Sequence, residues 1–173
     1  MPSPKKIFHA RRFDVEEVYQ PLADGTYLPR HVVRHPGAVV ILPLLDDQHV
    51  CLIRTYRVAV DQWLLELPAG TLEPNEPPLL TAGRELIEET GYEAAKIEHI
   101  HTFRMSPGIL DEKMHFFVAS QLTKNTPQRE LGEEIDNRIL SWSEIDGLLR
   151  DGKIEDAKTL VAILWYLRYR THA

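Results

Sequence analysis

Apolar and polar residues alternate along the first 34 positions of the chain, on either side of a turn at Ala23-Asp24-Gly25-Thr26. Alternation with a period of two is typical of half-buried strands, so we predict an antiparallel unit with strands at residues 13–19 and 27–34. Longer apolar runs at residues 38–45 and 49–56, split by Asp46-Asp47, indicate a buried hairpin. Further strands are expected at residues 63–67, 97–103, 113–120 and 138–142.

Three segments have helical signals instead. Glu76-Pro77-Pro78 suits the start of a helix, because proline is tolerated in the first turn, and Gly91 is typical of the residue that ends one. Ser143 predicts the cap of a second helix that runs to about Arg150, with Asp146 at the capping-box position. A third helix is expected from Asp156. The predicted apolar stripes are Leu79, Ala82 and Leu86 with Leu80 and Ile87 alongside in the first helix, and Leu160, Ile163, Leu164 and Leu167 in the third.

Composition narrows the choice of partners. A chain of 173 residues with 43% hydrophobic residues suits one compact domain with a small appendage, and its formal net charge of −6 argues against nucleic acids and anionic membranes as partners. The lone Cys51 lies in an apolar run, which favours a core position and a reducing cytoplasm. We find no signal peptide and no segment long enough to span a membrane.

Three carboxylates in the first predicted helix suggest its chemistry. Glu85, Glu88 and Glu89 are three and four residues apart, so a helix places them on one face. Two such charges about 6 Å apart in a shielded cleft repel by roughly 3 kcal/mol, and the C-terminal end of a helix disfavours carboxylates further. One alternative is a solvated acidic face stabilised by Arg84. The other is a divalent cation, Mg²⁺ or Mn²⁺, which prefers such hard oxygen ligands.

The spacing of these and neighbouring residues resembles the Nudix box, with one mild departure at Tyr92; the matching positions are Gly70, Glu76, Arg84, Glu85, Leu86, Glu88, Glu89 and Gly91. Residues 35–37, 63–70 and 106–108 look like the ADP-ribose or ADP-sugar pyrophosphatase branch. The resemblance implies an α+β fold, a Nudix-type α/β/α sandwich with a mixed β-sheet at residues 36–173. Residues 1–35 would form a small N-terminal antiparallel β unit. That unit is too small to bury its own apolar residues, so we expect it to pack across a partner in a homodimer.

The resemblance also implies roles at the metal site. Glu85 and Glu89 would be direct ligands of Mg²⁺, with Mn²⁺ as a substitute, together with the Ala69 carbonyl, and Glu88 would also reach a metal. Arg84 and Glu76 would fasten the preceding loop to the helix. The general base would be Glu133 or Glu134, in a loop that also holds Glu130 and a flexible Gly132. Glu112 is the competing candidate.

Substrate contacts are the last set of expectations. Arg57 is expected to bind phosphates through bidentate hydrogen bonds from its guanidinium, and Arg34 either does likewise or lies on the surface. Pro107 would shape a ribose pocket, Tyr27 would stack on adenine or lie in the core, and Glu66 belongs to the same set.

We expect magnesium-dependent hydrolysis of ADP-ribose or a related ADP-sugar to AMP and a sugar phosphate. The alternatives are a pyrophosphatase for GDP-mannose or other nucleotide sugars, and a nucleotide-sugar sensor without turnover. Five of the eight histidines lack metal-ligand spacing and are expected to be surface or core residues; they are His31, His35, His99, His101 and His115.

Overall fold

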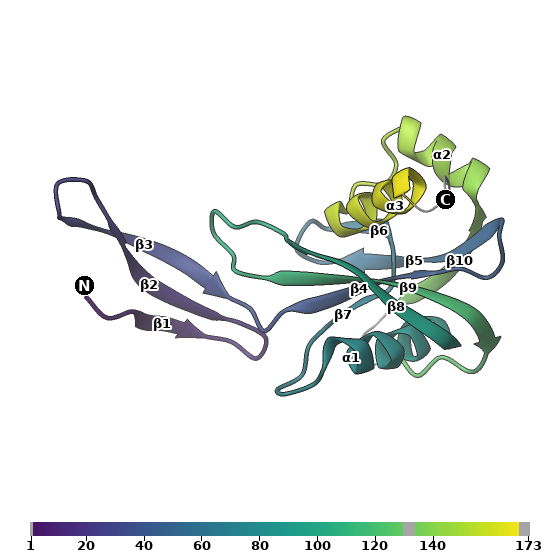
Figure 1. Ribbon diagram of the computed structural model, residues 1–173, viewed down its shortest axis with the longest axis horizontal. Helices are drawn as coiled ribbons and strands as arrows, with labels where there is room; N and C mark the ends of the chain where they lie inside the picture. Colours follow the sequence, from purple (N-terminus) through teal and green to yellow (C-terminus); the bar gives the residue numbers. More distant parts are fainter. Residues whose placement is uncertain (1, 130–133, 170–173) are drawn as a thin grey trace.

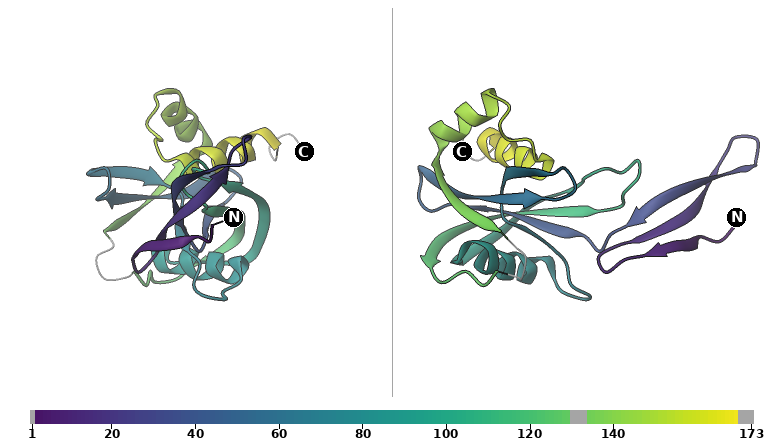
Figure 2. Two further views of the ribbon diagram at one scale, coloured as in Figure 1. Left: turned by 90° about the vertical axis from the view of Figure 1, so that its left-hand side faces the viewer. Right: turned by 180° about the vertical axis from the view of Figure 1, so that it is seen from behind.

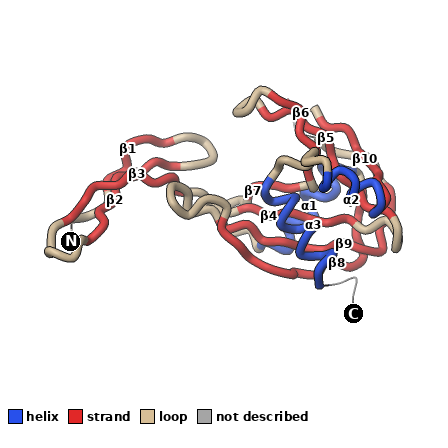
Figure 3. Tube along the Cα trace, turned by 90° about the horizontal axis from the view of Figure 1, so that it is seen from above, coloured by secondary structure: helices blue, strands red, loops and turns tan. Residues whose placement is uncertain are grey.

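The computed structural model describes residues 2–129 and 134–169, and it begins with a separate small sheet. This sheet has the order β1-β2-β3, with β1 at Lys5–His9, β2 at Asp14–Pro21 and β3 at Tyr27–Arg34, all antiparallel. It projects away from the rest of the chain (Figures 1 and 3). Strands β2 and β3 lie close to where strands were predicted, but their burial does not alternate from residue to residue. Strand β1 was not predicted, because all five of its residues are exposed and so carry no pattern of buried positions.

A mixed sheet forms the centre of the remaining fold. Its order is β7-β4-β9-β8, with β7 at Ala69–Thr71, β4 at Ala38–Pro43, β9 at Lys113–Lys124 and β8 at Tyr92–Arg104. Strand β4 is parallel to β9, whereas the other pairs are antiparallel. Every residue of β4 is buried, as expected for a central strand that is covered on both faces.

The predicted hairpin of residues 38–45 and 49–56 is wrong in its pairing. Strand β5 (His49–Arg57) lies in a second sheet of order β10-β5-β6, with β6 at Gln62–Glu66 and β10 at Ile135–Ser141. The strand pairing described between the two predicted strands is a single bridge, Leu44 to Val50. Because β7 and β9 occupy both edges of β4, β5 finds its partners in β6 and β10 instead.

Helices cover the two sheets from opposite sides (Figures 1 and 2). Helix α1 (Pro78–Glu85) continues into a π-helical turn, η1 (Leu86–Thr90), on one side, while α2 (Trp142–Arg150) and α3 (Ala157–Tyr169) lie on the other. Neighbouring β9 residues serve the two cores, since Phe116 packs towards Trp165 of α3 and Phe117 packs with Ala82 and Leu86. The expected α/β/α sandwich is confirmed.

Two details of the helices differ from the predictions. Leu79 and Leu80 are 50% and 62% exposed, because α1 turns only a narrow face made of Thr81 and Ala82 towards the sheet. In α3, Leu164 is likewise exposed, whereas Ala162 and Ile163 are buried. Within residues 2–129 and 134–169, no helix combines the length and the hydropathy needed to cross a membrane.

Cys51 lies in the core, as predicted. Its side chain is fully buried in β5, and burial raises the pKa of the thiol to about 12. The protonated thiol therefore acts as a small apolar residue at neutral pH.

The cap of α2 is Ser141 rather than the predicted Ser143. The Ser141 hydroxyl accepts from the Glu144 N–H, and the Glu144 carboxylate accepts from the Ser141 N–H at 2.8 Å, which completes a capping box. Ser141→Ala should therefore lower the free energy of unfolding by about 1 kcal/mol, measured by urea denaturation. Ser143→Ala is the matched control, and it should change stability by less than about 0.5 kcal/mol because Ser143 is an exposed residue inside the helix. Equal losses in the two variants would contradict the assignment.

Candidate functional site

A pocket of about 1100 Å³ opens where the N-terminal sheet, the mixed sheet and α1 meet. Its walls come from the β1–β2 turn, the segment between β3 and β4, the end of β5, strand β7, η1 and the start of α3. The described lining residues include seven carboxylates and six arginine or lysine side chains. Charges of both signs are concentrated here, with carboxylates in excess by one, so the described lining as a whole is not positive.

Arg84 holds three carboxylates at one wall of this pocket. It donates to both oxygens of Glu76 at 3.1 and 3.0 Å, and its Nη1 donates to Glu85 at 2.7 Å and to Glu88 at 2.8 Å. The bond from Arg84 is the largest cause that lowers the pKa of Glu76, to about 2, and Glu76 in turn raises the pKa of Arg84. The loop before α1 is thereby fastened to the helix that carries the other two carboxylates.

Glu85 fits into space that only a glycine leaves open. A Cβ atom added to Gly70 would lie 1.9 Å from the Glu85 carboxyl carbon, far inside any van der Waals contact. Strand β7 can therefore pass directly over the carboxylate because residue 70 lacks a side chain. This explains in physical terms why a glycine stands here, 15 positions before the glutamate.

Glu89 is fixed by the same strand. Its carboxylate accepts from the Ala69 N–H at 2.9 Å, and the residue is buried. Glu88 and Glu89 lie on η1, so the regular α-helix expected for the cluster is replaced here by a wider π turn, a form found often at functional sites. Gly91 ends this turn with a φ of 74°, and Arg129 and Asn137 donate to the carbonyls of Glu89 and Thr90.

The donor set fits a divalent cation in chemical type. Glu85, Glu88 and Glu89 all line the pocket and offer only hard oxygen atoms. In the part of the chain that the structure describes, no three acidic, histidine or cysteine side chains form a ready-made metal cluster. Mg²⁺ does not require one, since it is usually bound by one or two carboxylates, waters and substrate phosphates.

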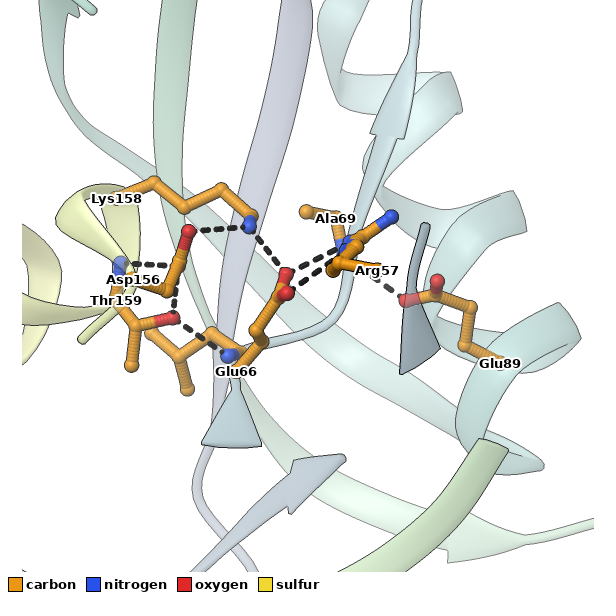
Figure 4. A network of polar contacts seen from close by, with 8 residues as sticks. Arg57, Glu66, Ala69, Glu89, Asp156, Lys158 and Thr159 are labelled. Carbon is orange, nitrogen blue, oxygen red and sulfur yellow. Dashed lines mark hydrogen bonds and ion pairs between the residues drawn. The ribbon is translucent and has the colours of Figure 1, made fainter. Parts of the chain in front are cut away.

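The predicted phosphate-binding residues are held in different ways. Arg57 forms a bidentate pair with buried Glu66, with both N···O distances at 2.7 Å (Figure 4). Arg34 donates to Glu16 at 2.9 Å and to Asp111 at 3.1 Å. Both arginines line the pocket. They therefore face the pocket with part of their donor capacity already used.

Two other predicted substrate contacts lie outside this pocket. Pro107 lines a smaller neighbouring hollow of about 200 Å³ together with Arg34 and Arg104. Tyr27 is 42% exposed at the start of β3, where it pairs with Pro21, and it does not line the pocket. It is therefore neither a core residue nor in reach of a ligand in the same chain.

The candidates for the general base differ in their position relative to the pocket. Glu112 lines the pocket, 3.5 Å from Nδ1 of His35. Glu134 is exposed and is not among the lining residues. Glu130 and Glu133 lie outside the described residues.

The sequence analysis missed many residues that line the pocket, among them five that lie far from the box in the sequence. Three come from the β1–β2 turn, and two come from the N-terminal end of α3; they are Arg11, Arg12, Phe13, Asp156 and Lys158. The turn follows a strand that was not predicted, so nothing in the local pattern tied it to the box residues. Asp156 was noted only as a helix start, although the Asp-Ala-Lys-Thr run could have drawn attention to a buried polar turn.

Comparisons with known proteins agree with this geometry. The NUDIX domain family matches residues 33–162. The chain is 37% identical to the ADP-ribose pyrophosphatase of Bacillus subtilis (strain 168) and 36% identical to the methanol dehydrogenase activator of Bacillus methanolicus, covering 92% of this chain and 87% of the relative in each case. A crystal structure of an ADP compounds hydrolase superposes with a TM-score of 0.83 at 26% identity, covering 98% of this chain and 92% of that one.

Gly70→Ala tests whether the contact with Glu85 shapes the carboxylate site. The added methyl group should displace Glu85 and lower the affinity for Mn²⁺ at least tenfold, measured by isothermal titration calorimetry. Gly147→Ala is the control, because a Cβ atom there meets nothing within 4 Å. Unchanged Mn²⁺ affinity in the folded Gly70→Ala protein would show that Glu85 does not belong to a cation site.

Proposed function

The chain belongs to the NUDIX domain family, and from that premise we propose that it hydrolyses the pyrophosphate bond of ADP-ribose or a related ADP-sugar to AMP and a sugar phosphate. The observation that carries the proposal is the pocket, in which Glu85, Glu88 and Glu89 stand on one wall and Arg57 and Arg34 face them from others. Relatives of similar length are named for ADP-ribose and ADP compounds. Nudix hydrolases generally use a divalent metal, and we propose Mg²⁺, with Mn²⁺ as a substitute.

Some residues of this chain would hold the cation that neutralises charge, and others would orient the substrate. A divalent cation held by Glu85, Glu88 and Glu89, with the Ala69 carbonyl nearby, would neutralise phosphate oxygens and make bound water more acidic. Arg57 and Arg34 keep free N–H groups for the phosphates. Arg84 acts on the carboxylates, because its described bonds all go to Glu76, Glu85 and Glu88. Water then forms a bond to one phosphorus, and the bridging oxygen departs with the other phosphate.

The two ends of the substrate would meet different surfaces. Phe13 is an exposed aromatic ring on the rim of the pocket, between Arg12 and Asp14, and planar bases stack on such rings. The hollow beside Pro107 adjoins the pocket through Arg34, which lines both. We therefore place the base near Phe13 and the second sugar towards Pro107.

A homodimer would complete the N-terminal sheet. Ile7, Phe8 and Leu28 are large apolar residues that the sheet leaves exposed, and the described outer edges of β1 and β3 are unpaired apart from a bridge between Val33 and Leu110. A second copy of the chain would cover them and would give Tyr27 a surface to contact. We also propose that residues 1–35 form a dimerising β unit and residues 36–173 the Nudix hydrolase domain, and that the enzyme works in the cytoplasm, where Cys51 would stay reduced.

Release of the nucleoside monophosphate from a panel of nucleotide sugars (AMP from ADP-sugars, GMP from GDP-sugars), with Mg²⁺ and with EDTA, tests the activity. We expect magnesium-dependent turnover led by ADP-ribose. Glu89→Gln should lower kcat at least 100-fold, the scale on which one charge-stabilising contact acts, whereas Glu93→Gln on the exposed side of β8 should keep it. Preference for a GDP-sugar would support the alternative substrate class, and binding without turnover would support the sensor.

The same assay ranks the candidates for the general base. Glu112→Gln, Glu133→Gln and Glu134→Gln are compared in single-turnover reactions at saturating Mg²⁺. The base variant should slow the chemical step about 100- to 10,000-fold without weakening substrate binding. Similar rates in all three variants would remove these residues from that role.

Light scattering at micromolar concentration tests the dimer. We expect twice the monomer mass for the native chain and a monomer for Ile7→Glu with Phe8→Glu, because each buried carboxylate would oppose association. A substitution at an exposed position of the main domain, Leu164→Glu, is the control and should leave the dimer intact. A monomer mass for the native chain contradicts the proposal.

A further inference from the structure

Glu66 is the centre of a polar network that joins β5, β6 and the start of α3 (Figure 4). Its side chain is 1% exposed. The Arg57 guanidinium takes both carboxylate oxygens, and Lys158 donates to Oε2 at 2.5 Å from the other side. Lys158 also donates to Asp156 at 2.9 Å. A single buried carboxylate is thus shared by two cations from different elements.

Asp156 also accepts hydrogen bonds within the turn that begins α3. Its Oδ2 accepts from the N–H and the hydroxyl of Thr159 at 3.0 and 2.6 Å, while Oδ1 accepts from Lys158. The Thr159 hydroxyl in turn accepts from the Leu67 N–H at 2.8 Å, just after β6. The start of α3 is therefore held beside the end of the strand that carries Glu66. This fixes the position from which the Lys158 side chain extends.

The charges in this network balance. Arg57 and Lys158 carry two positive charges, and Glu66 and Asp156 carry two negative charges. Burial alone would raise the pKa of Glu66, but the bonds and charges of Arg57 and Lys158 outweigh it, so the pKa lies below its ordinary value. Without Lys158, the buried Glu66 carboxylate would pair with one cation instead of two. Asp156 would lose the cation with which it pairs.

From this geometry we propose that Lys158 is a positioning residue: it fixes the Glu66 carboxylate, which in turn orients the Arg57 guanidinium towards the diphosphate. The inference rests on the proposed function. It adds a role for the start of α3, which makes no described bond to the box carboxylates of α1 and η1.

The geometry explains why orientation depends on Lys158. Glu66 accepts two of the five N–H groups of Arg57, so the plane of the carboxylate sets the plane of the fork and the direction of the remaining three. Lys158 holds Oε2 from the side opposite Arg57, and this prevents the carboxylate from turning. The Lys158 side chain is 10% exposed, so it is placed to act through Glu66.

A double-mutant cycle tests this path. Lys158→Met keeps the length of the side chain and removes its charge. We expect it to lower kcat/KM for ADP-ribose with Mg²⁺ about 10- to 100-fold, the effect of a small misplacement of a binding group. In an Arg57→Ala background the same substitution should change kcat/KM less than about twofold, because the group it orients is gone. Lys158→Arg, which keeps the charge, should recover part of the loss.

Binding gives a second readout that does not depend on turnover. The affinity for a methylene-bridged analogue of ADP-ribose, titrated in EDTA, should fall in Lys158→Met by a similar factor. Ile163→Ala is the matched structural control, since it opens a cavity in the buried face of α3 and removes no polar or charged atom from the network. It should lower the melting temperature and leave the affinity within about twofold.

If Lys158→Met does not fold, the double variant Glu66→Gln with Lys158→Met takes its place. It removes the charges of Glu66 and Lys158 together, so neither is left buried without the other. This pair should bind as weakly as Lys158→Met, since an amide oxygen cannot accept the whole fork. Native affinity in the pair, or equal losses from Lys158→Met in both Arg57 backgrounds, overturns the positioning role. A native chain that neither binds nor hydrolyses any nucleotide sugar overturns the proposed function and this inference together. A native chain that turns over while Lys158→Met matches it overturns the inference alone.

Discussion

Carboxylates taken out of water need cations beside them, and the arrangement of the pocket depends on how this chain supplies them. Arg84 pairs with Glu76, Glu85 and Glu88 and offsets one of their three negative charges, while Arg57 and Lys158 balance Glu66 and Asp156. In each group one guanidinium takes both oxygens of one glutamate, an arrangement that fixes direction as well as charge. The residues that face the pocket therefore have few alternative positions.

The short segment that follows β6 connects the two groups. Its Leu67 N–H is held by Thr159 of α3, and its Ala69 N–H is held by Glu89 of η1. Strand β7 begins there and pairs with β4, whose core position is set by β9. Helices on opposite faces of the sandwich thus reach one loop through main-chain donors, so the position of that loop is determined from both sides.

Local patterns in the sequence could predict much of this structure. The alternation at residues 27–34 and the apolar run at residues 38–45 mark real strands, and the glutamate spacing identifies the helix that lines the pocket. The pairing of β5 with β10 could not be predicted, because partners so far apart carry no local signal. Residues such as Arg12 and Lys158 reach the pocket only through the tertiary fold. The π turn was also hidden, since it changes the backbone bonds without changing residue types.

Arg84 also limits how strongly the box carboxylates can attract a cation. Glu85 and Glu88 each accept a bond from the same Nη1, so part of their negative charge is already balanced. Glu89 accepts from a neutral main-chain donor, the Ala69 N–H, and it is the most buried of the three. Three free carboxylates would bind a divalent ion tightly and would also repel the phosphates of a ligand. With Arg84 among them, the wall is less negative, so an anionic diphosphate can approach and supply the remaining oxygen ligands itself.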